Sequence, residues 1–175
     1  MIKDIKTEAL SKEIATRADT LPEFIYCEDA ARAIDEHVRR HYGDLVEVRS
    51  SVRGGAEGFY TRPSELAEMI HRIIGEAPCG RHLTLEMFCE GGAFTVRASS
   101  DEYDVSSLGT DMPLAAMALG AGVLIDTDGD SLLITADTLL CGKGIVSAIG
   151  RSALLRCLEE AYFRDIDPEN AEDQL

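Results

Sequence analysis

The stretch that decides the fold is RPSELAEMIHRIIGEA, residues 62–77. Its second residue, Pro63, suits the first turn of a helix, where no backbone N–H is needed. Apolar residues then recur at helical spacing: Leu66, Met69, Ile70, Ile73, Ile74 and Ala77. Pro78 and Gly80 end the pattern. The stretch therefore predicts an amphipathic helix with one buried face.

Strand patterns lie on both sides of this helix. Residues 45–52 alternate with a period of two, which predicts a strand with one buried face. Two further alternating runs, 82–89 and 93–99, are joined by a glycine-rich link and predict a hairpin. A second hairpin is predicted where the apolar runs 123–125 and 132–134 flank an Asp-Gly turn.

The remaining segments predict helices and loops. Phe24, Cys27, Ala30, Ala31, Ile34 and Val38 trace an apolar face that predicts a helix ending near Tyr42 and Gly43. A weak helix is expected over 3–17, a short one over 114–119 and a last one over 145–163. Between them, 53–58 and 100–111 are predicted to be links without regular structure, and the acidic end from 165 is expected to fray.

This order of elements predicts an α/β (α+β) two-layer sandwich, with a mixed, mainly antiparallel sheet and all helices on one face. We divide the chain into an N-terminal helical extension (1–20), a domain (21–140) and a C-terminal helix with an acidic tail (141–175). Two roles remain open for the last helix, docking onto its own domain or self-association.

Charge and cysteine content narrow the function classes. The 32 acidic residues against 17 basic ones give a formal charge of −15, which disfavours binding to nucleic acids and anionic membrane surfaces. Five scattered cysteines without a CxxC pair argue against a disulfide framework and a structural zinc site. With no apolar run near the length of a membrane span, we expect a cytoplasmic protein with reduced thiols.

The helix over 62–77 resembles the N-box helix of the GHKL (Bergerat-fold) superfamily, in particular the ATPase domain of histidine kinases. The similarity continues in the strand pair at 83–99 and in 112–136, which resembles the second glycine box with its helix and last two strands. It covers about 21–138. It implies a histidine-kinase-like fold and, in an intact member, a site for ATP and Mg²⁺.

The motifs that would hold ATP are degenerate. The two N-box asparagines fall on Arg72 and Glu76. Asp101 stands where the family's adenine-reading aspartate would be, but 102–104 place side chains and two negative charges where glycines are expected. At the second glycine box, Asp111 would repel phosphate and Pro113 has no N–H to donate.

The leading hypothesis is a non-catalytic regulatory or scaffold protein of bacterial signalling that binds no cofactor and contacts a protein partner, with a homodimer through the terminal helices as a further expectation. The alternative is a divergent nucleotide-binding protein or ATPase, in which Asp101 reads adenine and Glu76 holds the metal or activates water, with Arg72 in the same site. A third hypothesis is a small-molecule sensor that uses the vacated pocket.

Other motifs are weaker. His37 and His41 lie four residues apart on one helix face, a spacing that can bind a metal, but without a nearby carboxylate we expect a solvated polar face. Cys79 with His82 lacks a second pair of ligands, 126–130 reads as a hairpin turn rather than a calcium loop, and 142–144 lacks the spacing of a phosphate loop. No GxSxG elbow supports a hydrolase triad.

Overall fold

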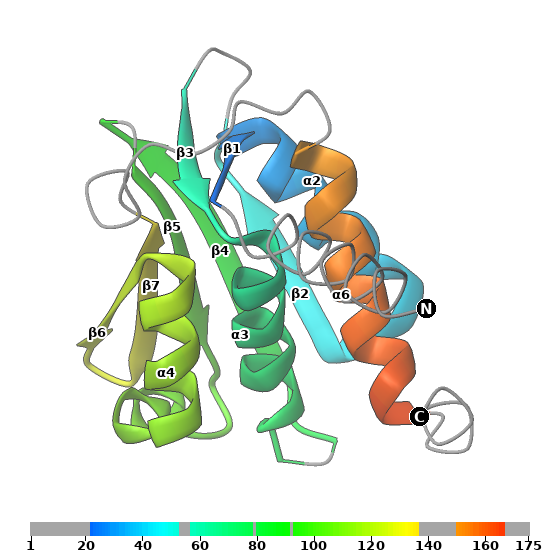
Figure 1. The fold of residues 1–175 in the computed structure, drawn as a ribbon. Helices are drawn as coiled ribbons and strands as arrows, with labels where there is room; N and C mark the ends of the chain where they lie inside the picture. The colour runs from blue at the N-terminus through cyan, green and yellow to red at the C-terminus, as the bar shows by residue number, and fades with distance from the viewer. Residues whose placement is uncertain (1–21, 53–56, 79, 92, 137–149, 167–175) are drawn as a thin grey trace, which may run out of the picture.

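The computed structural model describes residues 22–52, 57–78, 80–91, 93–136 and 150–166. Their helices cover one face of a sheet, as the sequence predicts (Figure 1). The elements in chain order are β1 (Glu23–Tyr26), α2 (Cys27–His41), η1 (Gly43–Leu45), β2 (Val46–Ser50), β3 (Gly58–Thr61), α3 (Pro63–Gly75), β4 (Leu83–Glu90), β5 (Ala93–Ser99), η2 (Val105–Thr110), α4 (Met112–Ala121), β6 (Val123–Asp128), β7 (Ser131–Ala136) and α6 (Gly150–Ile166). The helix expected at 3–17, the glycine-rich entry at 142–144 and the end of the acidic tail lie outside the described residues.

The main sheet has five strands in the order β2-β4-β5-β7-β6. β2 runs parallel to β4, and the other neighbours are antiparallel. Both predicted hairpins are present, and Gly91 and Gly129 take the left-handed conformation that tight turns need. The sheet is therefore mixed and mainly antiparallel, as predicted.

The core lies between this sheet and the helices. Buried residues alternate along β4 and β5, so only one face of each strand packs against the helical layer. On that face Phe94 stacks on Phe59 of β3, with ring centroids 5.1 Å apart. On the other face polar side chains contact each other across the strands, Thr95 with Thr135 and Arg97 with Asp128. The alternation of apolar and polar residues in the sequence thus correctly predicts that the helices cover only one face of the sheet.

A second, two-stranded sheet of β1 and β3 corrects the sequence prediction at two places. The helix expected to include Phe24 begins only at Cys27, and Phe24 lies in β1. The link expected through Gly58 contains the start of β3. A Cβ on Gly58 would lie 2.6 Å from the Ile25 carbonyl oxygen, so the close approach of the two strands requires glycine there. Likewise, 105–110 of the predicted link forms the short helix η2.

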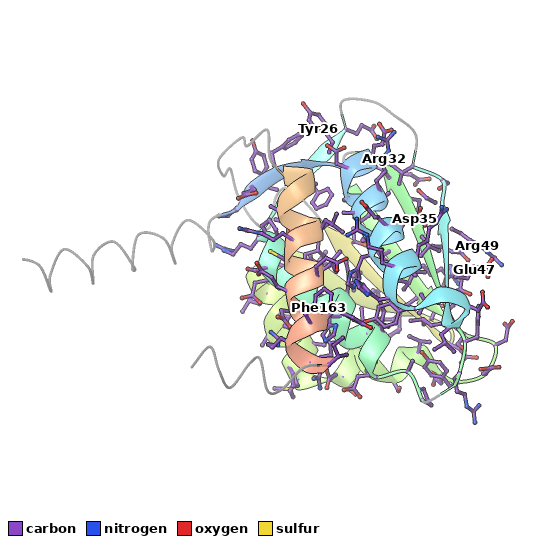
Figure 2. All side chains as sticks on the ribbon, turned by 90° about the vertical axis from the view of Figure 1, so that its right-hand side faces the viewer. Tyr26, Arg32, Asp35, Glu47, Arg49 and Phe163 are labelled. Carbon is purple, nitrogen blue, oxygen red and sulfur yellow. The ribbon has the colours of Figure 1, made fainter. Side chains whose placement is uncertain are left out.

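The last helix, α6, lies across α2 and α3 on the helical side of the sheet (Figure 1). Leu154 and Leu158, one turn apart, are fully buried there. Phe163, labelled in Figure 2, and Ile166 are half exposed near the end of the helix. The structure therefore shows α6 docked on its own domain, and it runs to Ile166, past the residue where fraying was expected.

The outward face of the edge strand β2 carries charged side chains. Glu47 and Arg49 point outward from it, as Figure 2 shows, and the Arg49 guanidinium donates to Glu47 at 3.2 Å. On the neighbouring helix α2, exposed acid–base pairs such as Arg39 and Asp35 cover the outer surface. Charged edges hinder pairing with strands of other chains. Among the described residues, no helix is both long enough and apolar enough to cross a bilayer.

Candidate functional site

An ion pair joins the predicted site residue Arg72 to Asp111, which stands at the position of the family's second glycine box. Arg72, on the last turn of α3, donates from Nε to Asp111 Oδ2 at 2.5 Å and from Nη2 to Oδ1 at 3.0 Å. The same carboxylate caps α4, because it accepts from the Leu114 backbone N–H at 3.1 Å. The hydrogen bonds from Arg72 hold the pKa of Asp111 below its usual value. One carboxylate thus fastens α3 to the start of α4.

Two more hydrogen bonds fasten the end of α4 to the residues that lead into α3. The Thr61 hydroxyl, fully buried, donates to the Ala121 carbonyl at 2.7 Å, and Arg62 donates to the Gly120 carbonyl at 2.7 Å. A Cβ on Gly120 would lie 3.0 Å from the Glu65 side chain, so the two helices are already in close contact. The carbonyls of the last turn of α4 are therefore satisfied by groups next to α3.

The other two predicted site residues do not belong to this joint. Glu76 caps α3 and is exposed, and its Oε1 lies 3.7 Å from Arg72 Nη2, a loose ion pair. Asp101 is exposed in the bend after β5. Within the described part of the chain, no hydrogen bond or ion pair links Asp101 to Arg72 or Glu76. The structure thus joins Arg72 to Asp111 and leaves Asp101 apart.

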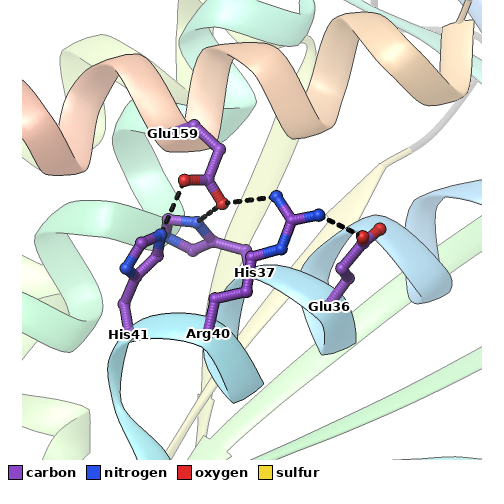
Figure 3. A network of polar contacts seen from close by, with 5 residues as sticks. All are labelled: Glu36, His37, Arg40, His41 and Glu159. Atoms are coloured by element: carbon purple, nitrogen blue, oxygen red, sulfur yellow. Dashed lines mark hydrogen bonds and ion pairs between the residues drawn. The ribbon is translucent and has the colours of Figure 1, made fainter.

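A second polar cluster connects α2 to α6 (Figure 3). His37 Nδ1 lies 3.1 Å from Glu159 Oε1, and His41 Nε2 lies 2.6 Å from Glu159 Oε2. Arg40 Nη1 approaches the same carboxylate at 3.5 Å. The expectation of a solvated polar face here is wrong, because α6 covers that face and brings a carboxylate from more than a hundred residues away.

Burial governs the charge state of this cluster. His37 is fully buried, and loss of hydration lowers its pKa, so the ring is neutral near pH 7. Burial also acts to raise the pKa of Glu159, but the hydrogen bonds from His41 and His37 outweigh it and the net shift is downward. The ring of Tyr162 stacks on His41 at a centroid distance of 3.9 Å. The cluster is a neutral histidine and an anionic glutamate in an aromatic setting.

Sequence reasoning missed Glu159 because nothing local connects it to α2. An indication was nevertheless present, since Glu159 follows Leu158 on the apolar face of a helix, where an unpaired carboxylate is unfavourable.

Two further polar contacts tie α6 to α3. Arg164 donates to Glu68 at 2.6 and 3.0 Å, and His71 lies 2.5 Å from Asp165.

Two described cysteines also lie together, although they are far apart in the sequence. Cys27 Sγ, at the start of α2, is 2.6 Å from Cys89 Sγ near the end of β4. Burial raises the pKa of both thiols, and Cys89 also donates to the Glu57 carboxylate at 3.2 Å. Both are free thiols. Cys79 and Cys141 lie outside the described residues.

The outward face of α4 is the most exposed apolar surface among the described helices. All ten residues of α4 are uncharged. Met112 and Leu119 are 77% and 84% exposed, and being seven residues apart they share one face. Ala115 and Ala116 between them are exposed as well, and Leu124 on β6 is half exposed. This face, Met112 to Leu119, is called the α4 surface below.

Comparison with known proteins gives structural neighbours only. No protein-family model matches the chain, and neither does any curated protein sequence. The cytoplasmic segment of the histidine kinase QseC is similar over 76% of this chain and 92% of its own, with 14% identity and a TM-score of 0.42. The Acinetobacter baumannii histidine kinase AdeS is similar over 63% of this chain and 62% of its own, with 12% identity and a TM-score of 0.34. The fold assignment itself rests on the sheet order and the helical layer described above.

Proposed function

We propose that this chain is a non-catalytic regulatory or scaffold protein of bacterial signalling, with a histidine-kinase-like fold that binds no ATP and acts through contacts with a protein partner. The observation that supports it most directly is the ion pair between Arg72 and Asp111. By the family resemblance, these two positions would face the metal and the phosphates of a nucleotide. Here they bind each other instead.

The start of α4 has little left to offer a phosphate. Anions bind helix N-termini through free backbone N–H groups. Pro113 has no N–H, the Leu114 N–H is taken by the Asp111 side chain, and the Ala115 N–H bonds to the Asp111 carbonyl. The Asp111 carboxylate adds a negative charge at the same place, which repels phosphate. The Arg72 guanidinium thus stands where Mg²⁺ is expected, and the Asp111 carboxylate stands where a phosphate is expected.

The α4 surface supports the second half of the proposal, contact with a partner. Exposed apolar residues gathered on one face of a helix are typical of sites that bind another protein. The chain carries a formal charge of −15, so it favours a partner whose charge is opposite. We therefore expect a partner helix that packs an apolar face against the α4 surface and carries lysines or arginines at its rim.

Calorimetric titration with ATP and ADP, each with and without Mg²⁺, tests the first half. We expect no heat of binding in the titration, and no rise in melting temperature when the same ligands are added in a thermal-shift measurement. A clear micromolar response would contradict the proposal and favour the alternative, a divergent nucleotide-binding protein. In that case Glu76→Ala and Asp101→Asn should abolish the response. If binding survives both changes, the predicted nucleotide site is also wrong.

Paired variants test the α4 surface. Met112→Gln with Leu119→Gln removes the apolar contact, whereas Ile166→Gln, at a position 56% exposed on α6, is the matched control. Each chain is immobilised and exposed to cell extract of the source organism. We expect the wild type and the control to retain a protein with a basic-rimmed amphipathic helix, and the double variant not to retain it. The purified partner should bind the wild type and the control with equal affinity, and the double variant more weakly. Equal retention by all three chains would exclude the α4 surface, and sedimentation of the chain alone reports whether the partner is a second copy.

A further inference from the structure

We propose that His37, His41 and Glu159 form a binding site for a transition-metal ion, with Zn²⁺ as the best fit, that links α2 to α6. The proposal is independent of the proposed function, because it concerns neither α4 nor the nucleotide positions. Within the described residues, these three side chains are the group whose ligand atoms come close enough for one ion, all within 4.8 Å of one another.

The donor set has the chemistry that zinc selects. Two imidazoles and one carboxylate are three of its ordinary ligands, and a site with three protein ligands keeps a fourth position for water. The histidines are four residues apart on α2, so both rings lie on the face that α6 covers. Glu159 and His41 are partly exposed, which leaves solvent a path to the fourth position.

The distances fit with a small adjustment. Zinc–ligand bonds of about 2.0–2.2 Å in a tetrahedron place neighbouring ligand atoms about 3.3–3.6 Å apart. The two observed nitrogen–oxygen distances are 3.1 Å for His37 and 2.6 Å for His41. The first distance is to Oε1 of Glu159 and the second to Oε2, so each nitrogen–oxygen pair needs to open by about 1 Å or less, and all three ligand atoms already lie within 4.8 Å of one another. A metal ion bound to all three side chains would therefore replace the two hydrogen bonds between the histidines and Glu159.

Arg40 is the group that opposes the ion. Its guanidinium lies 3.5 Å from Glu159 Oε1, but it is half exposed and also donates to Glu36 at 2.5 Å (Figure 3). It can keep the Glu36 contact and leave Glu159. A metal site predicts that Arg40→Gln binds the ion more tightly, since a competing positive charge is removed.

The test is titration of the full chain with Zn²⁺, together with Co²⁺, whose visible absorption reports tetrahedral coordination. We expect one ion per chain, loss of at least 100-fold in affinity for His41→Gln and for Glu159→Gln, and tighter binding by Arg40→Gln. His71→Gln with His82→Gln, which removes the other two histidines, and Cys27→Ser with Cys89→Ser are the matched controls and should bind as the wild type does.

Three results would overturn the proposal. They are absence of binding by the wild type at millimolar Zn²⁺, binding that persists in both His41→Gln and Glu159→Gln, and binding that is lost in either control. Circular dichroism of each apo variant separates loss of a ligand from loss of the fold. His37→Gln is left out because the ring is fully buried and the change would disturb packing.

Discussion

The docking of α6 on its own domain makes a quantitative prediction for Leu158→Ala. Leu158 is fully buried between α6 and the helices beneath it. Removing such a side chain loses its transfer free energy and leaves a cavity, so the free energy of unfolding should fall by about 2–5 kcal/mol. With a urea dependence of about 1–3 kcal/mol per molar, the unfolding midpoint should fall by roughly 0.7–5 M.

Urea unfolding followed by circular dichroism measures this change, and Ile166→Ala on the same helix is the control. Ile166 is 56% exposed, so its truncation should change stability by no more than about 0.5 kcal/mol. Equal midpoints for the two variants would refute the docking of α6. A Leu158→Ala effect that grows with protein concentration would instead indicate that α6 is covered by a second copy.

Three further predictions concern other contacts. The Arg72 partner lowers the folded pKa of Asp111 from 3.8, so this pair stabilises the fold above about pH 4, and the gain is lost as the pH falls through the folded pKa. Acid unfolding of Asp111→Asn should therefore show a shallower pH dependence than that of the wild type below about pH 4. Thr61→Val leaves the Ala121 carbonyl without its buried donor and should lower the free energy of unfolding by about 1–3 kcal/mol in urea. Hydrogen peroxide should oxidise Cys27 and Cys89 to a disulfide with release of two water molecules, seen as a loss of two mass units that Cys89→Ser abolishes.

The elements with strong periodicity could be predicted from the sequence. The helix expected over 62–77 is α3, Pro63–Gly75, and both hairpins lie where the turn residues indicate. The pair β1 and β3 could not, because each strand has only four residues and Phe24 fits the helical spacing that continues into α2. Short strands acquire their identity from the partner strand, which local patterns do not contain.

The same limit applies to the two candidate sites. Family resemblance drew attention to Arg72 and to the start of α4 but not to the ion pair between them, because that contact depends on how two helices distant in sequence pack. The spacing of His37 and His41 was visible, whereas their carboxylate comes from α6, 118 residues beyond His41. Contacts between helices distant in sequence depend on the tertiary arrangement, and no periodicity encodes them.

The position of α6 also has a consequence for synthesis. The surface of α2 and α3 that α6 covers is made early, yet the helix that covers it is complete only at Ile166, 91 residues after the end of α3 at Gly75. At about 5–20 residues per second, a ribosome needs roughly 5–20 s for that interval. Until α6 is complete, the apolar surface of α2 and α3 lacks the helix that buries it in the folded domain.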